Sequence, residues 1–115
     1  DLQPGLRGTA TLALSAPHAA VGDGVDLAVA LTSTARTAQD LVVDYAVHHV
    51  RANGGTSPKV FKGWKLALAP GETRALAKRH SLRPVTTRTL YPGLHRVEVR
   101  VNGCAVAAAA FDLRA

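Results

Sequence analysis

The sequence is poor in cysteine and in large aromatic side chains. Its 115 residues include one Cys, one Trp, two Phe, two Tyr and no Met. The single cysteine, Cys104, excludes an internal disulfide, and the few aromatic residues predict a thin core of Val, Leu and Ala. The length suits one core, so we expect residues 1–115 to form a single domain. Because the chain starts at "DLQPG" without Met, we expect it to be a piece of a longer protein.

Long hydrophobic segments are also missing. The longest apolar run, residues 104–111, is too short to cross a bilayer, and no segment resembles a signal peptide. We therefore expect a soluble, cytoplasmic protein without a membrane partner.

Acidic residues are absent from "KRHSLRPVTTRTLYPGLHR", residues 78–96, which carries five Lys/Arg and two His. Residues 1–44 have two Arg and five acids (−3), residues 45–97 have ten Lys/Arg and one Glu (+9), and residues 98–115 are balanced, which gives +6. A fold that gathers the central segment on one side would attract a polyanion. The alternative is that these cations keep a β protein soluble and protect its sheet edges.

Hydrophobic residues alternate with a period of two, as in residues 25–31, where Val and Leu alternate with Asp and Ala. Gly, Pro and Asn separate the alternating runs, and "NG" at 102–103 predicts a type I′ hairpin turn. The pattern predicts seven strands, at about 9–15, 24–33, 40–51, 59–69, 72–80, 94–102 and 104–113. Seven short antiparallel strands indicate an all-β immunoglobulin-like sandwich. It lacks the cysteine pair and the third-strand Trp of antibody domains, although Tyr91 stands where such sandwiches place a corner tyrosine.

Gly63 interrupts the alternation in "KVFKGWKLAL", residues 59–68. Without a break, Lys62 would share the core face with Trp64, at the high cost of burying an ammonium group. A β-bulge at Gly63 would place Phe61 on the core face and turn Lys62 outward with Lys65. We therefore expect a bulge.

No pattern of catalytic or metal-binding residues is present. His48 and His49 are adjacent in a strand, so their side chains project to opposite faces and cannot share one metal ion. Cys104 lies beside a turn with no histidine near it in sequence, and nucleotide-binding and hydrolase motifs are absent. We expect a domain that is not an enzyme by itself and uses no cofactor, metal or small-molecule substrate.

The feature that points to a function is the set of cations on the expected strands 59–69 and 72–80 and in the residues that follow, up to residue 96. Arg suits phosphate oxygens, and no row of exposed aromatic residues accompanies these cations to stack on bases. Contacts to the DNA duplex backbone, without sequence preference, are therefore the natural expectation. We also expect the strand that ends in "KRHS" to pair with the strand that contains "KVFK".

Residues 43–103 resemble the C-terminal Ig-like domain of bacterial DNA alkylation repair proteins, the AlkC-type alkylpurine DNA glycosylases with HEAT-like repeats. The resemblance is carried by VDY-x-VHHV, TSPKVFK, L-APGE, KRHS and TR-x-x-YPG-x-H, in that order. It implies that a helical-repeat domain of the same parent chain excises cationic bases such as 3-methyladenine. The Ig-like domain would be a C-terminal accessory that packs on the repeats and helps to enclose double-stranded DNA.

The same resemblance assigns no catalytic residue to this chain. It suggests seven candidate DNA contacts among the motif residues, namely Lys59, Lys62, Lys78, Arg79, His80, Arg88 and His95. The main alternative is a structural domain whose motifs dock onto the helical repeats without touching DNA. A third interpretation, a free-standing carbohydrate- or protein-binding module, would require an exposed aromatic patch.

Overall fold

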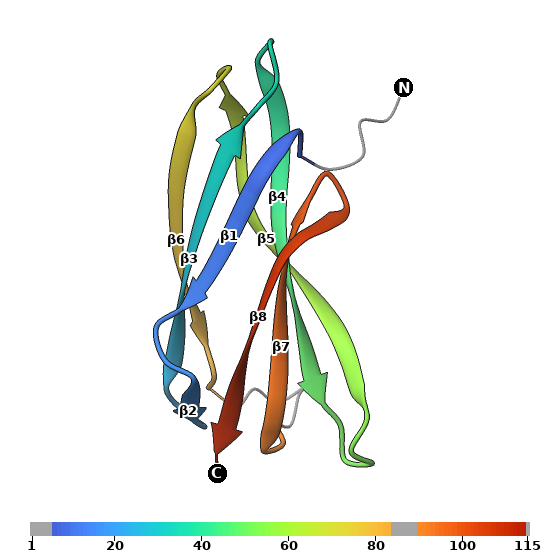
Figure 1. Ribbon diagram of the computed structural model, residues 1–115. Coiled ribbons are helices and arrows are strands. Elements are labelled where there is room, and N and C mark those ends of the chain that lie inside the picture. The colour runs from blue at the N-terminus through green and yellow to red at the C-terminus, as the bar shows by residue number, and fades with distance from the viewer. Residues whose placement is uncertain (1–5, 84–89, 115) are drawn as a thin grey trace.

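The computed structural model describes residues 6–83 and 90–114, and within them every regular element is a β-strand. The strands form a sandwich of two sheets, with three and five strands (Figure 1). The smaller sheet has the order β1-β3-β6 and the larger one the order β2-β8-β7-β4-β5. The strands are β1 (Gly8–Leu14), β2 (His18–Ala20), β3 (Gly24–Ser33), β4 (Gln39–Val50), β5 (Thr56–Leu68), β6 (Thr73–Ser81), β7 (Gly93–Val101) and β8 (Cys104–Arg114).

The expected immunoglobulin-like sandwich is confirmed, with each of the seven predicted strands present and one more. The additional strand, β2, is three residues long and pairs in parallel with the end of β8. The hairpin at residues 102–103 is also as predicted. Asn102 and Gly103 both have positive φ, 49° and 86°, as a type I′ turn requires.

The core lies between the sheets and is built mainly from Val and Leu. One cluster, around Tyr45, Leu82 and Phe111, fills the half of the sandwich near the β6–β7 connection. A second cluster, around Leu31, Leu68 and Val99, fills the other half. The alternating strands bury one face each, so the long hydrophilic side chains remain on the outer faces and at the edges.

The expected pairing of the "KRHS" strand with the "KVFK" strand is wrong. β6 pairs with β3 in one sheet, and β5 pairs with β4 in the other. The turn after Ala69, in which the amide of Glu72 donates to the carbonyl of Ala69, carries the chain from one sheet to the other. β5 and β6 are thus two edges that face each other across one open side of the sandwich.

Candidate nucleic-acid interface

The bulge predicted at Gly63 is present and determines where the lysines of β5 point. The β4–β5 register shifts between Val43 and Asp44, and Gly63 is the residue of β5 that has no partner. Phe61 consequently packs against the core, whereas Lys62 and Lys65 are exposed. Both lysines pair with outward-facing positions of β4, so they share the outer face of the larger sheet.

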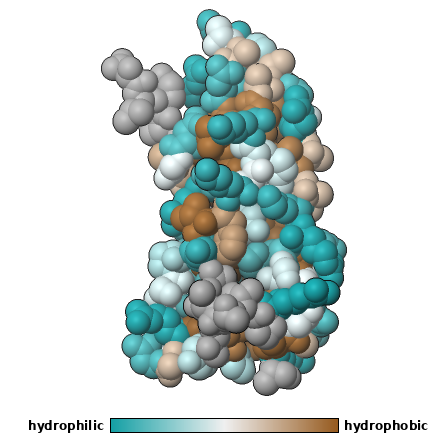
Figure 2. Space-filling model, turned by 180° about the vertical axis from the view of Figure 1, so that it is seen from behind, coloured by the Kyte–Doolittle hydropathy of each residue, from teal (hydrophilic) through white to brown (hydrophobic). Residues whose placement is uncertain are grey.

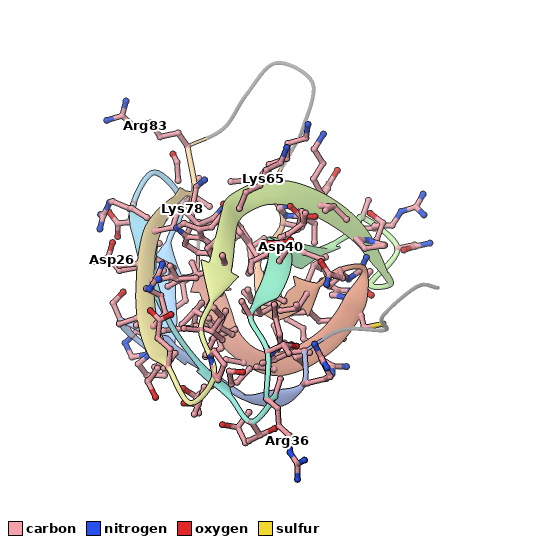
Figure 3. The ribbon with its side chains drawn as sticks, turned by 90° about the horizontal axis from the view of Figure 1, so that it is seen from above. Asp26, Arg36, Asp40, Lys65, Lys78 and Arg83 are labelled. Carbon is pink, nitrogen blue, oxygen red and sulfur yellow. The ribbon has the colours of Figure 1, made fainter. Side chains whose placement is uncertain are left out.

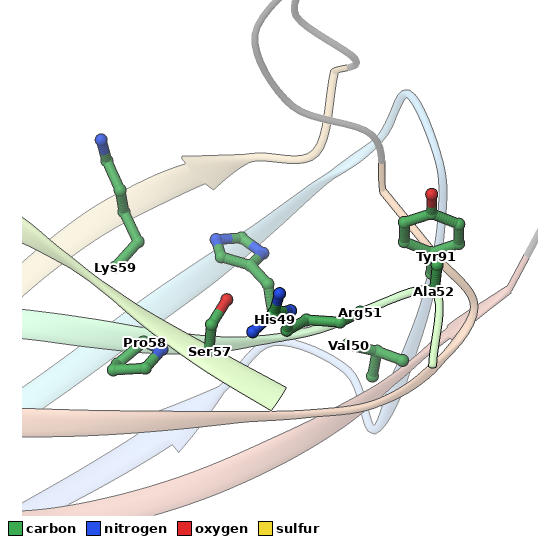
Figure 4. A pocket seen from close by; sticks show the side chains of 8 residues that line it. All are labelled: His49, Val50, Arg51, Ala52, Ser57, Pro58, Lys59 and Tyr91. Carbon is green, nitrogen blue, oxygen red and sulfur yellow. The ribbon is translucent and has the colours of Figure 1, made fainter. Parts of the chain in front are cut away.

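Lys59 lies on the opposite face of β5 from Lys62. Its partner across the ladder is Val47, which is fully buried, so its side chain starts from the inner face of the sheet. It is nevertheless exposed, because it lies near the end of the sandwich. Figure 4 shows the amine extending away from the strand.

Lys78 bridges the two sheets. Its Nζ donates a hydrogen bond of 2.9 Å to the carbonyl oxygen of Lys62 and lies 5.9 Å from the ring centroid of Trp64. The side chain is half-buried. An ammonium group has three donors, but these two contacts hold it against β5 rather than extended into solvent.

Arg79 points to the outer face of the smaller sheet. Its Nη1 lies 3.0 Å from Oδ1 of Asp26, its partner across the β3–β6 ladder. Both side chains are more than half exposed, so this ion pair contributes little stability and the guanidinium can exchange its partner. Arg79 and Lys62 therefore lie on different faces of the molecule.

Two of the candidate contacts, His80 and His95, are buried. His80 is 5% exposed and its Nδ1 lies 3.1 Å from the hydroxyl of Tyr45, whose pKa is raised by burial. His95 is completely buried, and its Nε2 donates to the carbonyl oxygen of Tyr91 at 2.9 Å. Both rings are buried in the described structure, so the exposed cations are better placed than these two histidines to contact DNA.

One further candidate, Arg88, lies outside the described residues. Of the described cations near it in sequence, Arg83 is exposed and follows shortly after β6. Seen along the sandwich, Arg83, Lys78 and Lys65 lie on the same side of the molecule, and Arg36 lies on the opposite side (Figure 3). On the face seen in Figure 2, hydrophilic side chains predominate and separate small hydrophobic areas.

A pocket of about 380 Å³ opens at the end of the sandwich where β4 turns into β5. It is lined by His49, Val50, Arg51, Ala52, Ser57, Pro58, Lys59 and Tyr91 (Figure 4). Arg51 and Lys59 are cations, Ser57 and Tyr91 have hydroxyl groups, and none of these eight residues is Asp or Glu. The motif-based candidates included only Lys59 of this set.

On the outer face of the larger sheet, the carboxylate of Glu98 is surrounded by basic side chains. Glu98 accepts from His48 Nε2 and from Arg100 Nη2, both at 3.1 Å, and Arg96 is 3.9 Å away. The hydrogen bonds from His48 and Arg100 hold the pKa of Glu98 below its usual value. Arg100 is therefore neutralised locally, whereas Arg96 remains mostly exposed.

Residues 6–83 and 90–114 contain no group of three His, Cys, Asp or Glu side chains placed to hold a metal ion. His48 and His49 project to opposite faces as expected, since His48 contacts Glu98 outside and His49 packs near His95 inside. No helix long and apolar enough to span a membrane occurs among the described residues.

Comparison with known proteins supplies the family. Residues 8–115 match the family model described as "Uncharacterised protein YhaZ, C-terminal Ig-like domain". The chain belongs to this family. YhaZ from Bacillus subtilis (strain 168) is 34% identical over 65 residues, which are 56% of this chain and 18% of YhaZ.

Among solved structures, the alkylpurine DNA glycosylase AlkC from Pseudomonas fluorescens, bound to DNA that contains an abasic site analog, has 36% sequence identity. The TM-score is 0.92, over 96% of this chain and 31% of the AlkC chain. A β-glucosidase from Listeria innocua, with 17% identity and a TM-score of 0.71 over 92% of this chain and 16% of its own, shares the fold alone. The chain thus spans less than a third of AlkC and less than a fifth of YhaZ.

Proposed function

We propose that this chain is a non-catalytic accessory domain of a cytoplasmic DNA alkylation repair glycosylase and that it binds the phosphate backbone of double-stranded DNA. The supporting observation is its likeness to AlkC, at a TM-score of 0.92 over 96% of this chain, in a structure that contains DNA. The proposal assigns base excision to a helical-repeat domain of the parent chain, with which this domain would pack. It assigns no reaction, cofactor or metal to residues 1–115.

The arrangement of the cations supports backbone contact rather than base reading. Lys62 and Lys65 share the outer face of β5, and Lys59 and Arg51 lie at the end of the same hairpin. All four are exposed. Lysine and arginine side chains along a rigid strand can meet successive phosphates, and such contacts carry no sequence preference.

The salt dependence of duplex binding tests this proposal. In fluorescence anisotropy with a labelled duplex, we expect the 115-residue chain to bind, with an affinity that falls steeply as salt is added. The double substitution Lys62→Ala, Lys65→Ala should weaken binding and reduce the slope of log K against log salt by about 0.9 for each phosphate that the variant no longer neutralises. Arg36→Ala is the matched control, because Arg36 is also exposed but lies on the opposite side of the molecule (Figure 3).

If the β5 and Arg36 substitutions weakened duplex binding equally, binding would depend only on the net charge of the domain. That result would contradict a defined DNA-binding face. The alternative, a domain that only docks onto the helical repeats, predicts a different result. In that case the intact parent protein carrying the β5 substitutions would lose thermal stability, while its DNA affinity per folded molecule would not change.

A further inference from the structure

The pocket at the end of the β4–β5 hairpin has the composition of a phosphate site. Its polar lining consists of one guanidinium, one ammonium, two hydroxyl groups and the His49 imidazole. Every one of these groups can donate a hydrogen bond, and among the residues that the structure describes no carboxylate lines the pocket to compete for the cations. Two other pockets that contain cations differ, because Asp44 lines the one beside Lys62 and Asp23 lines the one beside Arg79 and Arg83.

The backbone around Arg51 is fixed by its own hydrogen bonds. The amide of Arg51 donates to the carbonyl of Gly55 at 2.7 Å, and the amide of Gly54 donates to the carbonyl of Arg51 at 2.9 Å. The side chain of Asn53 closes the same loop by accepting from the amide of Gly55. Gly54 has a φ of 83°, a conformation that residues with a side chain rarely adopt. This tight loop holds the backbone of Arg51 in place at the pocket.

Tyr91 is held on the other side of the pocket by buried groups. His95 donates to its carbonyl oxygen, and the His95 ring stacks on Phe111 at a centroid distance of 5.4 Å. Gly93 allows the start of β7 to approach Val50 closely, because a Cβ at this position would lie 3.1 Å from the Val50 Cγ2. Figure 4 shows the His49 ring between Lys59 on one side and Tyr91 on the other. The pocket is therefore formed before any ligand arrives.

The size and the apolar part of the lining suggest more than a bare phosphate. About 380 Å³ is near the lower limit for small-ligand sites, which is ample for one phosphate group with its sugar. Val50, Ala52 and Pro58 are also among the residues that line the pocket, so part of its lining is apolar, which suits a deoxyribose ring. A second cation suits the negative charge of a phosphodiester, and the planar guanidinium of Arg51 can bind two of its oxygens.

We propose that this pocket binds one sugar-phosphate unit of a DNA strand, with Arg51 and Lys59 on the phosphate, Ser57 and Tyr91 as hydroxyl donors, and the apolar part of the lining against the sugar. The assignment rests on the proposed function, since it names the point at which the domain holds the backbone. It adds Arg51, Ser57 and Tyr91 to the contacts, none of which belongs to the motif-based candidates.

Nuclear magnetic resonance with two probes tests the pocket. We expect 2-deoxyribose 5-phosphate to shift the backbone amide signals of Arg51, Ser57 and Tyr91, and deoxyribose without phosphate to leave them in place. Duplex DNA should shift the same signals. Arg51→Ala should abolish the shift by the sugar phosphate and should reduce the salt slope of duplex binding by about 0.9, the value for one phosphate. Arg51→Lys should keep that slope but bind the duplex more weakly, because it retains the charge without the planar fork.

Arg51 is exposed, so these variants should fold, and their amide spectra verify it. If duplex DNA binds with a slope that Arg51→Ala does not change, the pocket assignment is wrong and the proposed function stands. If duplex DNA does not bind but the sugar phosphate shifts the pocket signals, the pocket is a site for a free sugar phosphate and the proposed function fails. If neither probe moves these signals, the pocket assignment is overturned.

Discussion

Gly63 is the residue that decides which face of β5 carries the lysines. A Cβ at this position would lie 2.6 Å from the carbonyl oxygen of Val43, a backbone atom that cannot move aside without distorting the ladder. The bulge could be predicted because an unbroken alternation would have buried Lys62. The histidines of the core could not be predicted in the same way.

The burial of His80 has a physical reason. On β6 the residues that face the interior are Arg74, Leu76, Lys78 and His80, whereas small Ala residues and Arg79 face outward. This arrangement reverses the usual rule that charged residues point to solvent, because β6 is the edge strand opposite β5, and Arg74 and Lys78 both donate to backbone carbonyl groups of β5. Hydrophobic alternation alone therefore gives no sign that His80 is buried.

Substituting Gly63 tests the role of the bulge. We expect Gly63→Ala to lower the free energy of unfolding by about 1–3 kcal/mol, because the added methyl group overlaps the Val43 carbonyl oxygen. Gly55→Ala is the control, since its Cβ would meet only the exposed Asn53 side chain, at 3.2 Å, and should change stability by less than about 0.5 kcal/mol. Urea denaturation of the two variants measures both values. Equal losses would show that the bulge tolerates a side chain.

At the scale of the strands, the sequence predicted which segments form strands better than it predicted which strands pair with each other. Seven strands and the hairpin at Asn102 follow from alternation and turn residues, but β2 is too short to show a period. The turn after Ala69 has residues that are typical of a hairpin, yet it connects the two sheets. The strands that it joins, β5 and β6, belong to different sheets and bury side chains on the faces that pack against each other. Local turn chemistry does not distinguish these two outcomes.

Glu98 on β7 should make the stability of the domain depend on pH. Its pKa is lowered from 4.5, chiefly by the hydrogen bonds from His48 and Arg100. A carboxylate with a lowered pKa in the folded state stabilises the fold above the unfolded-state pKa, and this contribution disappears as the pH falls through the folded-state pKa.

Glu98→Gln should therefore lower the free energy of unfolding by on the order of 1 kcal/mol near pH 7. The difference from the unsubstituted chain should vanish well below pH 4.5, where both side chains are neutral. Asp112→Asn is the control, since its ion pair with Arg114 is about half exposed and contributes little. Denaturation curves over this pH range measure the free energy of unfolding of each variant. If Glu98→Gln remained less stable than the unsubstituted chain in acid, the loss of stability would come from altered packing instead.

For the whole molecule, the separation of charge along the sequence is only partly retained on the surface. Asp26 and Asp44, from the acidic first part of the chain, are the ladder partners of Arg79 and Lys62 from the basic part. Pairing distant segments thus moderates the one-sided field that the sequence suggested. Among the described residues, the β5 hairpin brings Arg51 and Lys59 together at a pocket without a carboxylate. This concentration could not be inferred without the sheet pairing.

Lys78 is a motif cation whose role differs in the whole sandwich from the one suggested by sequence. It joins the open edges of the two sheets through the carbonyl oxygen of Lys62 and the face of Trp64. We expect Lys78→Ala to lower the free energy of unfolding by about 1–2 kcal/mol, the value of a hydrogen bond from a charged donor with a weak cation–π contact. Lys65→Ala, an exposed lysine on the facing strand, should cost less than about 0.5 kcal/mol.

Duplex binding should show the opposite order. Per folded molecule, Lys65→Ala should weaken binding because Lys65 faces solvent beside Lys62, and Lys78→Ala should have the smaller effect because its ammonium group is already held between the sheets. Measuring unfolding and anisotropy on the same two variants separates the two roles. If Lys78→Ala left stability unchanged and weakened binding more than Lys65→Ala, Lys78 would be a DNA contact and the bridge between β5 and β6 would be incidental.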